Sequence, residues 1–217
     1  MHARVTTATF QRDKLDEVIR YLNSHSAELR GMKGFHNILF LTDRATGKST
    51  IITLWNSEED LKAGETSGYY QARMAELAPF ATTQPTREVC SVALDDIAGL
   101  TSGAGAARTV TLLAQPGKVD EIARVMRESI LPAARQQPGY RGLLLLLDRG
   151  SGKCIASSQW TTAADLKATE TGGYFQAQIA KVQPYVAGQV IREEYELTLP
   201  ALTPAPITQT QPHAPAP

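Results

Sequence analysis

The sequence has no excess of charge of either sign. Lys and Arg total 22, Asp and Glu total 22, and the formal net charge is zero. This balance excludes a strongly basic nucleic-acid-binding protein and an acidic disordered chain. No apolar run reaches the roughly 18 residues that a membrane span needs, and the first residues contain no apolar core of a secretory signal. We therefore expect a cytoplasmic protein with no nucleic-acid or membrane partner.

Cysteine is also scarce, and the residue types that can bind metals do not cluster in the sequence. The two cysteines, Cys90 and Cys154, form no motif, and the four histidines show no metal-ligand spacing. The sequence has neither a phosphate-binding loop nor a glycine-rich dinucleotide fingerprint. We expect no metal, no cofactor and no disulfide.

An internal repeat is the most informative feature of the 217 residues. Between residues 34 and 94, about 24 of roughly 61 positions are identical to those 105 residues later. Upstream the offset is 104, so one residue is inserted near Leu131 and Pro132. Matching segments are 43–48 with 148–153, Trp55 with Trp160, 60–63 with 165–168, and 65–72 with 170–177. The chain is therefore a duplicated unit of roughly 95 residues.

The repeat divides the chain into four parts. The first unit covers residues 1–95 and the second covers 107–199. Residues 96–106, which contain Ser102-Gly103-Ala104-Gly105, form a linker. Residues 200–217 are rich in proline and nearly free of charge, which predicts a disordered tail.

Each unit shows the same order of elements. In the first unit, residues 4–10, 35–42, 49–55 and 87–94 have the composition of strands. Residues 13–30 have helical periodicity, and a second helix begins after Ser57, is interrupted at Gly68 and ends before Pro79. Five consecutive leucines in 140–147 predict a strand that is covered on both faces. The order β-α-β-β-α-β is that of a ferredoxin-like unit.

This order predicts an α+β fold. Each unit forms a four-stranded antiparallel sheet with both helices on one face, and the bare apolar face needs a partner. The other copy supplies it, so we expect two ferredoxin-like units packed sheet to sheet as a pseudo-dimeric α+β barrel. The sequence leaves open whether two such chains associate further as a homodimer.

Each half resembles an antibiotic biosynthesis monooxygenase (ABM) domain of the dimeric α+β barrel superfamily. The resemblance rests on the strand ending in Trp55, the helix start at residues 57–61, Gly68-Tyr69-Tyr70, and the strand that opens with Arg87-Glu88. In the second half, Trp160, residues 165–166, 173–175 and 192–193 match. The resemblance implies a homodimer fused into one chain, and activities that include cofactor-independent oxygenation of phenols and quinol precursors, and oxidative haem degradation.

The sequence departs from the haem-degrading branch. That branch carries an axial histidine on the helix after the tryptophan. No histidine lies between Trp55 and Pro79 or between Trp160 and Pro184, and Glu65 and Glu170 occupy the corresponding region. The haem-degrading function is therefore disfavoured.

Three pairs of equivalent residues are candidates for a site. Trp55 and Trp160 could stack on an aromatic substrate, or could be core residues. Tyr69 and Tyr174 could donate a proton to a substrate oxygen, or could only pack a helix on the sheet. Arg87 and Arg192 could stabilise a substrate anion, or could pair with Glu65, Glu88 or the copies of these glutamates.

The remaining candidates differ between the halves. His36 could be a general base, or a surface histidine, and its counterpart is Arg141. Asn37 is replaced by Gly142 in the second half. We assign His36, Tyr69, Arg87, Tyr174 and Arg192 as catalytic, and Trp55, Asn37, Arg141 and Trp160 as substrate-binding.

Two functions fit these residues. The first is a cofactor-independent monooxygenase that oxidises a small apolar or aromatic molecule in a cavity between sheet and helices. The second is a non-catalytic ligand-binding or stress-related protein with the same fold, because no set of residues demands one catalytic geometry.

Overall fold

The computed structural model describes residues 1–97 and 105–199, which contain two units of β-α-β-β-α-β order. The first unit consists of β1 (His2–Thr9), α1 (Leu15–Arg30), β2 (Phe35–Thr42), β3 (Lys48–Trp55), α2 (Glu58–Thr66), α3 (Tyr69–Leu77) and β4 (Thr86–Asp95). The second consists of β5 (Gly105–Ala114), α4 (Val119–Val125), a π-helical turn (Met126–Ile130), α5 (Leu131–Ala134), β6 (Tyr140–Asp148), β7 (Lys153–Trp160), α6 (Ala163–Thr171), α7 (Tyr174–Val182) and β8 (Val186–Leu199). The fold class predicted from the sequence is confirmed.

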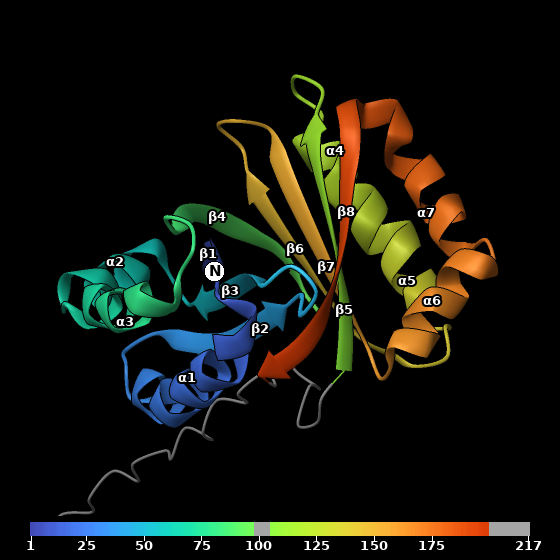
Figure 1. Ribbon diagram of the computed structural model, residues 1–217. Coiled ribbons are helices and arrows are strands. Elements are labelled where there is room, and N and C mark those ends of the chain that lie inside the picture. The colour runs from blue at the N-terminus through green and yellow to red at the C-terminus, as the bar shows by residue number, and fades with distance from the viewer. Residues whose placement is uncertain (98–104, 200–217) are drawn as a thin grey trace, which may run out of the picture.

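The eight strands form one closed barrel in the order β1-β3-β2-β8-β5-β7-β6-β4. Within each unit the pairing is antiparallel, and the helices lie on the outside of the barrel (Figure 1). The sequence predicted sheets that pack face to face. The structure also joins their edges, because β8 pairs with β2 and β4 pairs with β6. Closure gives each of the eight described strands a neighbour on both sides.

Each strand buries side chains on both of its faces. In β6, Leu144 and Leu146 belong to the core inside the barrel, whereas Leu143, Leu145 and Leu147 pack under the helices of the second unit. This alternation is that of a strand with period two. The run of five leucines was predicted to be covered on both faces, and all five are buried.

The second helix of the first unit begins at the predicted cap, Ser57. The Ser57 hydroxyl accepts a hydrogen bond from the Asp60 backbone N–H at 3.0 Å and donates one to the Asp60 carboxylate at 2.8 Å. Thr162 and Asp165 repeat this arrangement. Each cap satisfies an N–H group that the helix itself leaves unpaired.

The first helical segments of the two units differ by the one residue that is inserted in the second unit. Helix α1 is regular, but its counterpart contains the π-helical turn at Met126–Ile130 between α4 and α5. A π turn accommodates one extra residue within a helix. The turn lies immediately before Leu131 and Pro132, so it accounts for the change in the repeat offset.

Part of the predicted linker lies within the described residues. Ile97 is fully buried in the barrel core, and the Asp96 carboxylate accepts a hydrogen bond from the Tyr140 hydroxyl at 2.7 Å. Strand β5 starts at Gly105, inside the predicted linker. The rest of the linker and the predicted tail (98–104 and 200–217) lie outside the described residues. Among the described helices, none is long and apolar enough to cross a membrane.

We predict that Gly139→Ala destabilises the fold more than Gly173→Ala. Both glycines have positive φ, +74° and +76°, which costs roughly 1–2 kcal/mol in any other residue. A Cβ on Gly139 would lie 2.4 Å from the Asp165 carboxyl carbon, whereas nothing lies within 4 Å of one on Gly173. Displacing Asp165 disturbs the helix cap and adds roughly 1 kcal/mol. Urea denaturation of both variants measures the difference, and equal losses would contradict the explanation.

Candidate functional site

An apolar cavity of about 80 Å³ lies in the second unit, between the outer face of the sheet and the helices. Its walls are mainly aliphatic side chains from β5, β6, β7, α4, the π turn and α7. The polar side chains in its lining are Arg108, Ser158, Tyr174 and Gln178. An apolar cavity with a few converging polar groups has the composition of a small-molecule site.

The fold places these side chains through simple periodicity. Arg108, Val110 and Leu112 alternate along β5 and therefore share the face that the helices cover. Gly173 takes a φ of +76°, which lets the chain turn sharply between α6 and α7. Tyr174 is the first residue after this turn, so its ring reaches back over the sheet to the cavity.

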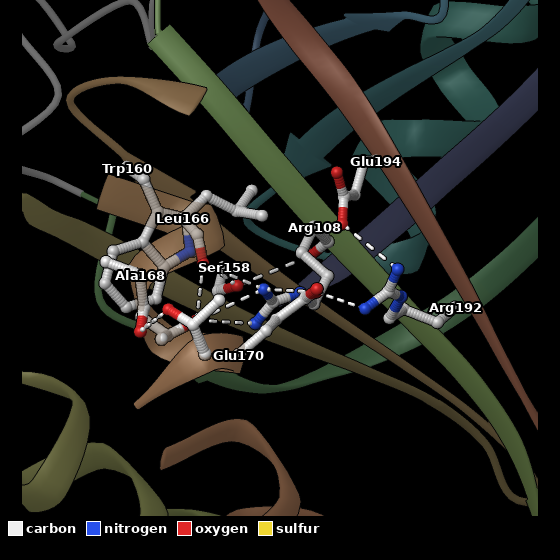
Figure 2. Close-up of polar contacts among 10 residues, drawn as sticks. Arg108, Ser158, Trp160, Leu166, Ala168, Glu170, Arg192 and Glu194 are labelled. Atoms are coloured by element: carbon white, nitrogen blue, oxygen red, sulfur yellow. Dashed lines mark hydrogen bonds and ion pairs between the residues drawn. The ribbon is translucent and has the colours of Figure 1, made fainter. Parts of the chain in front are cut away.

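Arg108 is the charged group of the cavity, and its side chain is only 3% exposed. Its guanidinium donates hydrogen bonds to the Glu170 carboxylate at 2.8 Å, the Leu166 carbonyl at 3.1 Å and the Thr169 hydroxyl at 3.1 Å (Figure 2). Its Cζ also lies 4.3 Å from the centre of the Phe175 ring. Burial lowers the pKa of Arg108, although a guanidinium remains charged in proteins.

One nitrogen of Arg108 has no protein partner. The Nε atom is buried, and no acceptor reaches it among the residues that the structure describes. A buried donor without an acceptor costs about 1–3 kcal/mol. A ligand oxygen could relieve this cost once the Arg108 side chain turned its Nε toward the cavity, because that atom has no surface open to it.

Glu170 links Arg108 to Arg192. Burial disfavours the charged carboxylate, but the hydrogen bond from Arg192 and the charge of Arg108 outweigh it and lower the pKa of Glu170. Arg192 pairs with both Glu170 and Glu194 (Figure 2). Arg192 is not among the residues that line the cavity. Its guanidinium carbon lies 5.8 Å from the centre of the Phe175 ring. Arg192 therefore contacts the carboxylate that holds Arg108.

Tyr174 and Trp160 line the cavity. Burial raises the pKa of Tyr174 to about 12, so its hydroxyl keeps its proton at neutral pH. The Trp160 indole Nε1 donates to the Ser158 hydroxyl at 3.0 Å, and its ring meets Tyr140 edge to face. The indole nitrogen is thus satisfied within the protein, and Trp160 offers the cavity an apolar ring.

The equivalent residues of the first unit are arranged differently. The Tyr69 hydroxyl donates to the His25 carbonyl at 3.1 Å, and Arg87 pairs with Glu65. Trp55 is buried, with its Nε1 donating to the Thr53 hydroxyl at 3.1 Å. Tyr69 lines a smaller cavity of about 40 Å³.

The remaining sequence candidates lie away from these cavities. The His36 imidazole Nε2 pairs with the Asp95 carboxylate at 3.1 Å. Asn37 is buried, and its side-chain oxygen accepts from the Ile38 backbone N–H. Arg141 is exposed at the irregular start of β6. The structure therefore brings Tyr174 and Trp160 together in one cavity lining and pairs Arg192 with Glu170, and it does not bring His36, Asn37 or Arg141 to the same place.

Arg108 is the functional candidate that the sequence analysis missed. It stands at the repeat position of Arg4, and each lies on a strand otherwise composed of small and apolar residues. An arginine kept at the same buried strand position in both copies was a signal. Both guanidiniums are buried and lie over an aromatic ring, Tyr70 for Arg4 and Phe175 for Arg108.

The cavity does not suit a haem group. Its lining contains no histidine. Within residues 1–97 and 105–199, no cluster of three or more His, Cys, Asp or Glu residues could hold a metal ion.

Comparison with known proteins finds a family match within the first unit. Residues 1–76 match the model of the antibiotic biosynthesis monooxygenase family. The first unit is therefore similar to an ABM domain, and the second unit repeats the sequence and fold of the first. An uncharacterized protein of Mycobacterium tuberculosis is 41% identical over 63 residues, 29% of this chain. The match spans about a quarter, 27%, of that relative's length.

Solved structures share the fold over most of the chain. A proposed monooxygenase of Lactobacillus acidophilus has a TM-score of 0.70 at 10% identity, over 90% of this chain and 92% of that chain. An anthrone oxidase-like protein has a TM-score of 0.64 at 16% identity, over 90% of each chain. At these identities the comparisons show a common fold.

We predict that Glu170→Gln destabilises the protein in a pH-dependent way. The variant leaves Arg108 with its buried charge uncompensated, which lowers the free energy of unfolding by about 1–3 kcal/mol at pH 7. The folded-state pKa of Glu170 lies below the ordinary 4.5. Its stabilisation is thus fully present above pH 4.5 and is lost as the pH falls through the lowered value.

Urea denaturation at pH 7 and pH 3 measures this effect. The difference between wild type and Glu170→Gln should shrink at pH 3. The matched control is Glu121→Gln, because Glu121 pairs with Arg124 on the exposed face of α4, where such a pair contributes little. A Glu170→Gln loss that is equal at both pH values would rule out the ion pair as its cause.

Proposed function

We propose that the protein is a cofactor-independent monooxygenase that oxidises a small aromatic substrate in the cavity of the second unit. The observation that carries the proposal is a buried guanidinium, Arg108, which lines a mainly apolar cavity and has an unpartnered Nε. The ABM match and the monooxygenase-like structural relatives support the same class of activity.

The cavity suits the chemistry that O2 requires of an organic substrate. A phenolate or enolate can give an electron to O2, whereas a neutral ring reacts slowly. Arg108 would stabilise the anion, in the way that a preorganised cation stabilises developing charge in a site that excludes water. Tyr174, whose raised pKa keeps it protonated, would donate a hydrogen bond to the same oxygen.

The overall reaction balances without an external reductant. For an anthrone-type substrate, a ring CH2 group becomes a carbonyl group. One atom of O2 enters the product, and the other leaves as water with the two hydrogens of the CH2 group. The substrate supplies the electrons, and the residues of the cavity bind it, exclude water and stabilise its anion.

The predicted catalytic residues take different roles in this proposal. Tyr174 contacts the substrate, and Trp160 forms part of the apolar wall. Arg192 is a positioning residue, because it holds Glu170, which in turn holds Arg108. His36 lies elsewhere, so the proposal contains no histidine base, and the substrate must ionise through its own acidity and the charge of Arg108.

The test is O2 consumption by the purified chain with anthrone and with a hydroquinone as substrates. We expect uptake by the wild type and a loss of roughly 100-fold in kcat in Arg108→Met, because a cation in contact with the developing anion is removed. Tyr174→Phe should lose roughly 10-fold or more. Arg108→Lys keeps the charge and should retain more activity than Arg108→Met.

Two control variants separate the site from general effects on folding. Tyr21→Phe removes a hydroxyl that bonds Glu76 at the surface of the first unit. Arg124→Met removes an exposed arginine of α4. Both should keep wild-type rates. Absence of O2 uptake with both substrates, in a protein that still binds aromatic molecules, would overturn the oxygenase and support the non-catalytic binding protein.

A further inference from the structure

The two units differ in the space between sheet and helices. In the second unit this space is one cavity of about 80 Å³. The same region of the first unit contains two smaller cavities, of about 40 Å³ and about 10 Å³. Ile51 and Met74 line both of the smaller cavities, so these side chains stand at the division between them.

Side-chain size at equivalent positions explains the division. Ile51 on β3 corresponds to Ala156 on β7, and both point toward the helices. Phe40, which is fully buried under the helices of the first unit, corresponds to Leu145. The first unit thus fills with an isoleucine and a phenylalanine the volume that an alanine and a leucine leave open in the second. The spaces that remain in the first unit, of about 40 Å³ and about 10 Å³, leave less room for a ligand than the 80 Å³ of the second unit.

The helical segment that covers this space also carries a smaller side chain in the second unit than in the first. Leu29 of α1 lines the first unit's larger cavity, and its counterpart in the second unit is Ala134. The π turn at Met126–Ile130 changes the register between these points, and Met126 and Ile130 line the cavity. Single π turns in helices are frequent at functional sites because they re-aim side chains.

The tyrosine hydroxyls differ too. Tyr69 donates to the His25 carbonyl at 3.1 Å. The counterpart of His25 is Ser129, within the π turn, and no protein group among the described residues bonds the Tyr174 hydroxyl. Only in the second unit is the phenol proton free to meet a ligand.

We propose that the second unit alone binds the substrate and that the first unit is a filled copy that completes the barrel. The substrate class is a small planar phenol, with its hydroxyl oxygen between Tyr174 and the Arg108 Nε. A space of about 80 Å³ holds several waters at roughly 10–15 Å³ each by this measure, and so a small ring system. The inference rests on the proposed function for its site, and it concerns binding, not turnover.

The test is titration of the full chain with 1-naphthol by isothermal calorimetry. We expect one molecule bound per chain. Ala156→Ile, which gives the second unit the side chain of the first, should weaken binding at least 10-fold. The matched variant Ile51→Val, in the first unit, should leave the affinity within twofold. Tyr174→Phe should weaken binding severalfold.

Circular dichroism and a second variant distinguish a loss of binding from a failure to fold. Circular dichroism of each variant shows whether it folds, and Ala156→Val serves if Ala156→Ile does not, with a smaller loss expected. Two molecules bound per chain, no binding, or undiminished binding to the folded Ala156 variants would overturn the inference. One molecule bound without O2 uptake would overturn the proposed oxygenase and leave the inference standing.

Discussion

The structure depends on one constraint: each sheet is apolar on both faces and has two free edges. Helices cover one face of each sheet. The other face is covered only because the second sheet lies opposite, and Leu144 and Ile52 meet there in a common core. The edges are satisfied by pairing β2 with β8 and β4 with β6. Neither unit is complete without the other, and fusion in one chain provides the partner at fixed ratio.

The closed barrel leaves the outer layer free to change. Residues inside the barrel must fit both units at once, whereas residues under the helices pack mainly within one unit, with Leu94 of β4 joining the outer layer of the second unit. Arg108, Tyr174 and Ala156 belong to this outer layer, and so do Ile51 and Phe40 of the first unit. Duplication followed by divergence in the outer layer can therefore open a cavity in one copy while the other maintains the barrel.

The fold was readable from the sequence because each element carried a local signal. The Ser57 cap, the leucine run of β6 and the repeated turn at residues 43–48 each specify local structure, and the repeat confirmed every one of them twice. Closure through β2–β8 and β4–β6 was not readable, because strand edges carry no side-chain signature. The π turn was visible only as an offset of one residue.

The site was readable only in part. Tyr174 and Trp160 follow from motif positions, and both line the cavity. Arg108 was missed because a single arginine in a strand is usually exposed, and burial by α6 cannot be seen in sequence. His36 was selected for its chemistry alone, and the fold pairs it with Asp95, away from the cavity. Side-chain chemistry indicates which residues could act in a site, whereas the packing of the fold determines which of them lie close together.

The most direct test of the account is a crystal structure of the protein soaked with 1-naphthol. We predict one molecule in the cavity of the second unit, with its hydroxyl oxygen within hydrogen-bond distance of the Tyr174 hydroxyl and the Arg108 Nε. The equivalent space in the first unit should remain filled by Ile51 and Phe40. A molecule bound in the first unit or inside the barrel, with the cavity beside Arg108 left empty, would contradict the account.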